Sequence, residues 1–326
     1  MRTLTAAIIT VGLVASLSAC ATAAPSGDCE PTVKSGDSSA LITATGKAGT
    51  LLKPAFPTPL VTKGIEVSTI SAGDGDTVYP GEIADFHLTV VDAKTAEVVP
   101  ITGIDADSIL RRTVGETSDK FGTILDCAAV GDRLGVTISA EDIGFSGGGL
   151  EPEDTVVLVI DVVRSFIGRA DGVPQLAKNG MPAIALAPSG QPGVTIPNAD
   201  APTKTQTATT ILGSGKKVKE SDGEGLVIHQ TILSWDSKKV LTSTWEWNDA
   251  PAVPTTVLAK ADRTGSGAGV IPGVAKALIG STVGSQIVVV VPPGDDSFAD
   301  GATLPEGATA DDTLVYVIDV LGVQKD

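Results

Sequence analysis

The sequence has few aromatic residues, few cysteines and histidines, and no cluster of basic side chains. Phe, Trp and Tyr together make up 3% of its 326 residues, and there are three cysteines and two histidines. Lysine and arginine total 23 against 39 acidic residues, which gives a formal charge of −16. Because that charge repels phosphate backbones, we do not expect nucleic acid as a partner.

The sequence also lacks an apolar run of about 20 residues, the length that a transmembrane helix needs. A shorter apolar stretch at residues 6–15 follows a positive residue, a pattern typical of a secretory signal. It ends in Leu-Ser-Ala-Cys at 17–20, which resembles the bacterial lipobox, where the cysteine is acylated and becomes the new N-terminus. We expect a lipoprotein signal peptide at 1–19 and lipidation of Cys20 outside the cell membrane. Ordinary cleavage after Ala24, which would discard Cys20, is the alternative.

Cys29 and Cys127 remain once Cys20 is set apart. An even pair of cysteines in an oxidising compartment is expected to form a disulfide. Closing a loop of this size stabilises a fold by about 4–5 kcal/mol in the chain-entropy model. The bond would attach the lipidated leader, residues 20–61, to the first domain. Two separate buried thiols are the alternative.

A chain of this length exceeds what one small core usually occupies, so two domains are expected. Val, Ile, Thr, Ala and Gly dominate the composition, which suits short strands joined by turns. Apolar segments bounded by turn residues predict strands at 86–91, 134–138, 226–233 and 287–291. Residues 122–125 and 274–279 lack strand alternation and predict one short helix in each domain. The expected class is α+β, dominated by sheet.

The two halves of the chain repeat each other. Both histidines, His87 and His229, stand in the frame Gly-x5-His. Three further blocks keep the same order: 73–78 with 213–218, 130–132 with 283–285, and 154–161 with 312–319. The spacing between matched blocks grows along the chain, as in a duplicated domain whose second copy carries loop insertions. We expect domains at 62–165 and 209–326, joined by a linker at 166–208.

The linker is rich in Pro, Gly and Asn, and it interrupts the repeat. Its apolar pieces at 183–186 and 194–196 predict short strands. Since a mobile linker would carry less apolar material, part of this segment is expected to join the second sheet.

Several short motifs occur in a fixed order across residues 211–323. They are Gly-Ser-Gly-Lys-Lys-Val at 213–218, Val-Ile-His at 227–229, Val-Ile-Pro-Gly at 270–273, Leu-Ile-Gly at 278–280, Val-Gly at 283–284, Val-Val-Pro-Pro at 290–293 and Thr-Leu-Val-Tyr at 313–316. Together they resemble the FKBP-type peptidyl-prolyl cis-trans isomerases, and the whole chain resembles secreted lipoproteins with two FKBP-like domains. The resemblance implies, in each domain, a twisted antiparallel β-sheet wrapped around one short α-helix, with an aromatic-lined pocket between them.

The resemblance also implies which residues of the second copy line the pocket. Ile271 would donate its N–H to the substrate carbonyl, with Val270 beside it, and Tyr316 would fill the aromatic position of the last strand. Phe298 would take the place of a tyrosine in the flap. The reaction, rotation about an X-Pro bond with a barrier of about 18–20 kcal/mol, requires no metal or cofactor, because a dry cleft favours the twisted amide.

Other positions depart from the family pattern. Gln230 stands in place of a tyrosine, Leu241 in place of a phenylalanine, and Val274 in place of the tryptophan of the pocket floor. The cleft is therefore expected to be wider and less aromatic. The first copy departs further and is interpreted as structural or partner-binding; its residues at the corresponding positions are Leu88, Phe121 and Phe145.

Two functional hypotheses result. The first is a membrane-anchored, extracytoplasmic prolyl isomerase that assists the folding of exported, proline-containing polypeptides. The second is a catalytically weak or inactive FKBP-like chaperone, anchored in the same way, that binds proteins. The first is favoured because aliphatic replacements keep the cleft dry. The two histidines lie within apolar strands and are interpreted as structural rather than as metal ligands.

Overall fold

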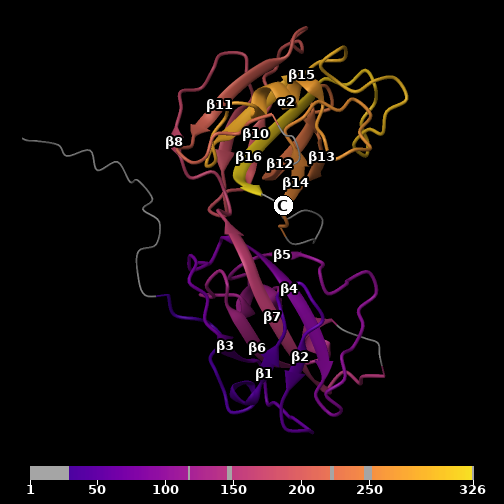
Figure 1. The fold of residues 1–326 in the computed structure, drawn as a ribbon. Helices are drawn as coiled ribbons and strands as arrows, with labels where there is room; N and C mark the ends of the chain where they lie inside the picture. Colours follow the sequence, from indigo (N-terminus) through magenta and orange to yellow (C-terminus); the bar gives the residue numbers. More distant parts are fainter. Residues whose placement is uncertain (1–28, 117, 145–148, 221–223, 246–251, 325–326) are drawn as a thin grey trace, which may run out of the picture.

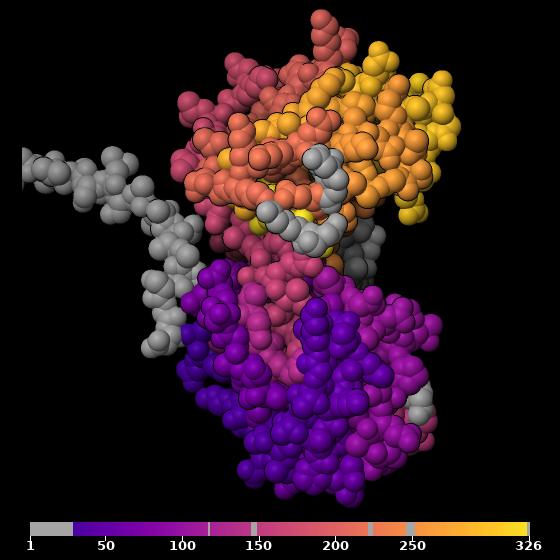
Figure 2. Space-filling view, in the orientation of Figure 1, coloured from indigo at the N-terminus to yellow at the C-terminus, as the bar shows by residue number. Residues whose placement is uncertain are grey.

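The structure, a computed structural model, describes residues 29–116, 118–144, 149–220, 224–245 and 252–324. Two lobes, each built on one antiparallel sheet, meet at a narrow waist (Figures 1 and 2). We call residues 29–166 the first lobe and residues 167–324 the second lobe. The long strand β7 (Thr155–Phe166) crosses the first lobe and ends at the waist (Figure 1).

The first lobe contains a five-stranded sheet of order β3-β6-β7-β4-β5. Its other strands are β3 (Glu66–Ser71), β4 (Ile83–Asp92), β5 (Leu110–Thr113) and β6 (Arg133–Ser139). A separate two-stranded hairpin precedes this sheet, formed by β1 (Thr43–Thr45) and β2 (Lys53–Ala55). The short helical elements of this lobe are η1 (Ser39–Leu41), α1 (Lys120–Ile124) and η2 (Glu141–Ile143).

The second lobe contains a seven-stranded sheet of order β13-β12-β16-β15-β11-β8, with β14 also paired to β12. Its strands are β8 (Val173–Pro174), β11 (Gln206–Leu212), β12 (Gly225–Ser234), β13 (Val240–Ser243), β14 (Thr255–Leu258), β15 (Gln286–Val291) and β16 (Leu314–Gln324). A hairpin of β9 (Ala183–Leu186) and β10 (Pro192–Thr195) forms a further two-stranded sheet. The helix of this lobe is α2 (Pro272–Leu278).

The same strand order recurs in both sheets. The series β3-β6-β7-β4-β5 corresponds to β11-β15-β16-β12-β14, and β13 and β8 are additions of the second lobe. The register agrees as well, because His87 lies opposite Asp161 and His229 lies opposite Asp319. The repeated sequence blocks therefore correspond to strands at equivalent places in two sheets.

The predicted α+β class, with a sheet wrapped around a helix in each domain, is wrong. The two α-helices among the described residues have five and seven residues, whereas the strands form four sheets. These helices coincide with the apolar stretches at 122–125 and 274–279, but one or two turns cannot cover a sheet. The second face of each sheet is covered by β-hairpins instead, so the chain is mainly β.

Each large sheet buries both faces. On β16, Tyr316 and Ile318 point into a core that includes α2, while Val315 and Val317 point into a second core on the opposite face. Partly buried residues of the β9–β10 hairpin, Ile184 and Val194, pack against that second core.

The first lobe has the same arrangement. Leu158 and Ile160 of β7 enter one core, and Val157 and Val159 enter another, which contains Ile42 from beside the β1–β2 hairpin. The hairpin segments that precede the two sheets are thus equivalent covers. The pieces at 183–186 and 194–196, predicted as short strands, form the β9–β10 hairpin, which packs on the face of the second sheet. The part of the segment that joins the second sheet is β8, next to β11, together with the first residues of β11.

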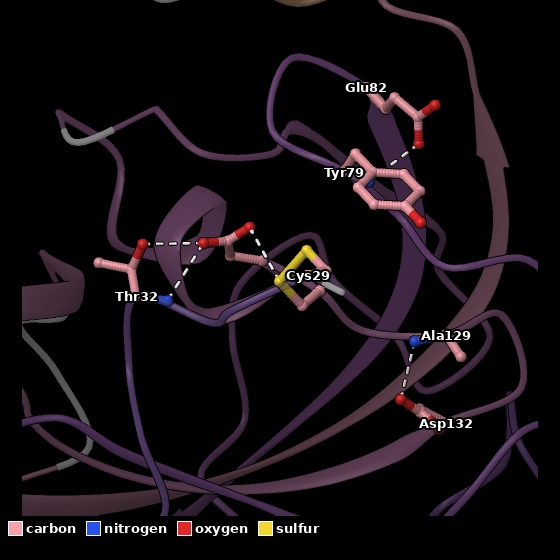
Figure 3. The surroundings of a disulfide bond; sticks show 8 residues. Cys29, Thr32, Tyr79, Glu82, Ala129 and Asp132 are labelled. Atoms are coloured by element: carbon pink, nitrogen blue, oxygen red, sulfur yellow. Dashed lines mark hydrogen bonds between the residues drawn. A yellow bond between two sulfur atoms is a disulfide. The ribbon is translucent and has the colours of Figure 1, made fainter. Parts of the chain in front are cut away.

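A disulfide joins Cys29 to Cys127, the pair predicted from the sequence (Figure 3). The buried carboxylate of Asp126 beside it accepts hydrogen bonds from the N–H and hydroxyl of Thr32, at 3.1 and 2.8 Å. Together these contacts attach the start of the described chain to the turn after α1. The predicted lipidation site, Cys20, lies outside the described residues. Among those described, no helix is long and apolar enough to cross a membrane.

Removing the disulfide with the double variant Cys29→Ser, Cys127→Ser should destabilise the first lobe. The bond closes a loop with a sequence separation of 98 residues, and loss of a native disulfide typically costs about 2–5 kcal/mol. Urea unfolding of variant and wild type measures the effect. A midpoint unchanged in the variant, with the wild type shown to be oxidised, would contradict the structural role of the bond.

Candidate functional site

The predicted pocket residues of the second lobe come together in one apolar cluster. Ile271, Val274 and Tyr316 form its buried floor, with exposed fractions of 3%, 1% and 5%. Partly buried residues surround them at the rim, namely Val270, Phe298 and Leu241. The sheet, α2 and the loops on both sides of α2 all contribute to the cluster. The floor is thus closed by its own side chains, and the rim carries the accessible surface.

Gln230 stands at the same face of the sheet. It lies on β12 between Ile228 and Ile232, both members of the apolar cluster, and strand alternation places the three on one side. Its partner across the strands is Ile318. Gln230 is half-buried, so the side chain at this position brings an amide to the edge of an otherwise apolar site.

Ile271, whose side chain belongs to this cluster, has a backbone N–H without an acceptor among the described residues. Ile271 is the N-cap residue of α2, with φ of −56°, and its carbonyl accepts a hydrogen bond from the Ala275 N–H at 2.9 Å. The preceding residue, Val270, is fully paired, since it donates to the Lys260 carbonyl and accepts from the Asp262 N–H. No described residue accepts a hydrogen bond from the Ile271 N–H. Because buried amide groups are nearly always paired, an N–H without a described acceptor marks Ile271 as a candidate ligand contact.

The loop before α2 positions the rim. Arg263 donates from Nε to the Ser297 carbonyl at 3.0 Å, and from Nη2 to the carbonyls of Gly294 and Phe298 at 2.9 and 3.3 Å. The Ala299 N–H donates back to the Arg263 carbonyl. Arg263 therefore holds the loop that carries Phe298 in place. Sequence reasoning missed this residue, although an isolated arginine within a Gly- and Ser-rich loop was a usable signal.

Tyr316 brings an uncharged hydroxyl to the cluster. Burial raises the pKa of Tyr316, so the phenol remains protonated at any physiological pH. Within the described part of the chain, its hydroxyl makes no hydrogen bond. The floor thus combines aliphatic side chains, one aromatic ring and one neutral hydroxyl, an environment suited to an apolar group such as a proline ring.

Each histidine lies on the face of its sheet that is opposite to the core containing the α-helix. His229 is 1% exposed, stacks on Trp245 with ring centroids 4.0 Å apart, and places Nδ1 2.9 Å from the Thr244 hydroxyl. Burial lowers the pKa of His229 to about 3, so the ring is neutral. His87 is bound through Nδ1 to the Ser108 carbonyl at 3.0 Å. Neither histidine reaches the Ile271 cluster, because successive residues of a strand alternate between faces.

The first lobe fills the corresponding place with its own rings. Phe121 of α1 stacks on Phe86 with centroids 5.8 Å apart, and the Arg112 guanidinium lies 5.6 Å from the centre of the Phe121 ring. Leu88 is 8% exposed and belongs to the same core. Phe145 lies outside the described residues. The helix of the first lobe thus contributes an aromatic ring to the core, where α2 of the second lobe contributes Val274.

No protein-family model matches the sequence, and no curated protein matches it. Solved structures similar to it include the three FKBP domains of wheat FKBP73, at 14% identity and a TM-score of 0.32, covering 81% of this chain and 96% of that one. FkpA from Escherichia coli matches at 18% identity, with a TM-score of 0.30 and 45% and 53% of the two chains covered. A multi-domain immunophilin from Arabidopsis thaliana matches at 17%, with a TM-score of 0.30 and coverage of 40% and 48%.

The alignments span about half the length of the second and third of these structures. With identities of 14–18% and TM-scores of 0.30–0.32, these matches carry no argument about the activity of this chain.

Asp319 should make stability depend on pH. Its carboxylate, 2% exposed, accepts hydrogen bonds from the Ala170 N–H and from Gln286 Nε2, both at 2.8 Å. Burial nevertheless raises the pKa of Asp319 to about 6. Because the pKa of Asp319 is higher in the folded protein, its protonated carboxyl stabilises the fold. This contribution is fully present below pH 3.8, the unfolded pKa, and is lost as the pH rises through about 6.

We therefore expect the stability of the wild type relative to Asp319→Asn to fall by about 3 kcal/mol between pH 4 and pH 7.5, because the pKa of this carboxyl is higher by about two in the folded protein. Urea unfolding followed by tryptophan fluorescence measures this, since Trp235 and Trp245, the tryptophans that the structure describes, belong to the second lobe. The exposed control, Asp295→Asn, should leave the profile unchanged. A difference between wild type and Asp319→Asn that does not vary with pH would refute the assignment.

Proposed function

We propose that the second lobe is a peptidyl-prolyl cis-trans isomerase site. The observation that carries the proposal is the N–H of Ile271, without an acceptor among the described residues, at the edge of a buried apolar floor. An X-Pro substrate would place its proline ring over Tyr316 and Val274, and the carbonyl before the proline would accept from Ile271. Two elements of the reaction would thereby be supplied, a donor held by the backbone and an apolar surface.

The chemistry follows from amide resonance. Rotation about the X-Pro bond has a barrier of about 18–20 kcal/mol because the planar amide loses its resonance on twisting. The twisted amide is less polar than the planar one, so an apolar surface favours the transition state over the bound substrate. A donor held by the backbone of α2 restrains the carbonyl while the rest of the peptide turns. The reaction breaks no covalent bond, so it needs no nucleophile.

The side chains around the floor argue for slow turnover. Gln230, Leu241 and Val274 occupy positions where the family that this sequence resembles has aromatic rings, so the proline ring would contact less surface. Tyr316 and Phe298 are the aromatic residues that remain at the site. We infer an isomerase whose proline contacts are weaker than those of an aromatic pocket.

The setting of the activity is also a proposal. Lipidation of Cys20 would anchor the protein on the outer face of the cell membrane, where exported polypeptides fold. The acidic composition, with a formal charge of −16, supports polypeptide rather than nucleic acid as the partner. Proline-containing exported proteins are the proposed clients.

Two variants at Ile271 distinguish the contribution of its backbone N–H from the contribution of its side chain. Ile271→Pro removes the N–H at a residue whose φ of −56° suits proline, whereas Ile271→Val keeps the N–H and trims the side chain. In a protease-coupled assay with a proline peptide, we expect Ile271→Pro to lower kcat/KM at least tenfold and Ile271→Val to lower it less than threefold. A wild type no faster than buffer, or equal rates in the two folded variants, would sink the isomerase proposal.

The closed floor favours a second candidate function, a chaperone that binds unfolded exported proteins without catalysing rotation. In that case binding of an unfolded model substrate should be the same for the wild type and for Tyr316→Ala, as measured by suppression of its aggregation. Suppression that disappears in folded Tyr316→Ala would contradict this candidate and return the role to the Ile271 cluster.

A further inference from the structure

A groove of about 600 Å³ lies between the two lobes, and the residues that line it do not include those of the proposed isomerase site. Its walls come from the end of β7 and the 76–82 loop of the first lobe, and from the end of β16 in the second lobe. The apolar part is formed by Phe166, Ile167, Leu321 and Val323, and the polar part includes Asp76 and Glu82. In Figure 2 the waist of the molecule marks the level at which the lobes meet.

The two walls are held together by direct contacts between the lobes. Arg111 pairs with the fully buried Asp85 at 2.7 Å, and it also donates to the Thr256 hydroxyl at 2.8 Å and to Gln324 Oε1 at 3.1 Å. Its guanidinium lies 5.3 Å from the centre of the Phe166 ring.

Phe166 in turn packs on the backbone of the second lobe at Gly322. A Cβ atom added to Gly322 would lie 2.3 Å from Phe166 Cδ1, so only glycine admits this approach. The groove is therefore a preformed feature of the docked lobes rather than a gap that a partner must open.

Charge at the groove is negative. Asp76 is exposed and Glu82 is half-buried, and the Glu82 carboxylate accepts from the Tyr79 N–H at 2.9 Å (Figure 3). Burial raises the pKa of Glu82, the bond to Tyr79 opposes the rise, and the like charge of Asp76 adds to it. The cation in the lining, Lys216, lies 3.4 Å from Glu224, which compensates its charge.

We propose that this groove binds an extended polypeptide segment in which a large apolar side chain adjoins Lys or Arg. The apolar side chain would contact Phe166 and Val323, and the basic group would meet Glu82 and Asp76. Such a segment needs no proline. The groove would therefore recognise an apolar side chain next to a basic one, whereas the Ile271 cluster would recognise an X-Pro bond. It would hold a client beside the isomerase site, or independently of it.

The experiment measures binding of three fluorescent, proline-free peptides to the full chain. The first alternates Leu and Phe with Lys, the second has Glu in place of Lys, and the third has Ser in place of the apolar residues. We expect only the first to bind well, at least tenfold more tightly than the others. Raising the salt from 50 to 300 mM should weaken its binding several-fold, because the ionic part is solvent-accessible.

Matched variants locate the site. The double variant Asp76→Asn, Glu82→Gln should raise Kd of the first peptide at least fivefold, while Asp295→Asn combined with Asp300→Asn, which removes the same charge at exposed positions elsewhere, should change it less than twofold. Val323→Ser, at the apolar wall, should also weaken binding. Ile271→Pro should leave the Kd of the first peptide unchanged. Peptide binding at the groove can therefore fail or succeed independently of the isomerase activity.

Equal binding of the Lys and Glu peptides would overturn the proposal, as would equal Kd values for the two charge-removal variants. Circular dichroism and thermal unfolding confirm that each variant folds. If Val323→Ser is unstable, the salt dependence and the peptide series on the wild type still decide the question, since a partner held by apolar contact alone would show neither preference.

Discussion

Burial of both faces of each large sheet is the constraint on which the rest of the structure depends. On β16, nine consecutive residues are buried, from Leu314 to Gly322, and their side chains alternate between two cores. Covering only one face would leave the Val315 and Val317 side of the sheet in water. Burying apolar surface contributes about 25 cal/mol per Å², so the hairpin segments that cover these second faces are part of the folded units.

Two-sided burial also determines which polar groups the sheets contain. Asp161 and Asp319 lie at equivalent places on the covered faces, opposite His87 and His229. A buried carboxylate must be paired, and the two lobes meet this need differently. Asp161 forms a two-pronged pair with Arg133, at 2.6 and 3.0 Å. Asp319 instead accepts hydrogen bonds from neutral groups, and burial raises its pKa to about 6 although these bonds oppose the rise.

Arg133 and Asp319 also hold in place the hairpin segments that cover the second faces of the sheets. Arg133 donates to the carbonyl of Gly46, in the loop between β1 and β2, at 3.1 Å. Asp319 accepts from Ala170, at the start of the segment that leads to the second hairpin. The opposite faces are apolar apart from Gln230. There the second lobe carries Ile271, whose N–H has no described acceptor, while the first lobe packs Phe121 into the equivalent region. One duplicated frame thus supports a candidate site in one lobe and a filled core in the other.

The sequence alone determined the repeat, the strands and the cysteine pair. These features are local or periodic: Val, Ile and Thr in alternating runs favour strands, and matched blocks show in the printed residues. It also grouped Val270, Ile271, Val274, Phe298 and Tyr316, because the resemblance assigns them by position. Composition could not show that the segments before each sheet cover its second face. Short apolar pieces within Pro- and Gly-rich stretches resemble a linker, and only the folded structure shows the apolar face on which they pack.

Only the tertiary structure decided the class, the state of the site and the junction between the lobes. The helices are one or two turns long, so the cover of each sheet came from hairpins, and the α+β expectation was wrong. The absence of a described partner for the Ile271 N–H depends on where every neighbouring carbonyl lies. The groove depends on Arg111 meeting Thr256 and Gln324, residues far apart in the chain. Contacts of this kind leave no period or motif in a sequence, because each is set by the packing of whole sheets.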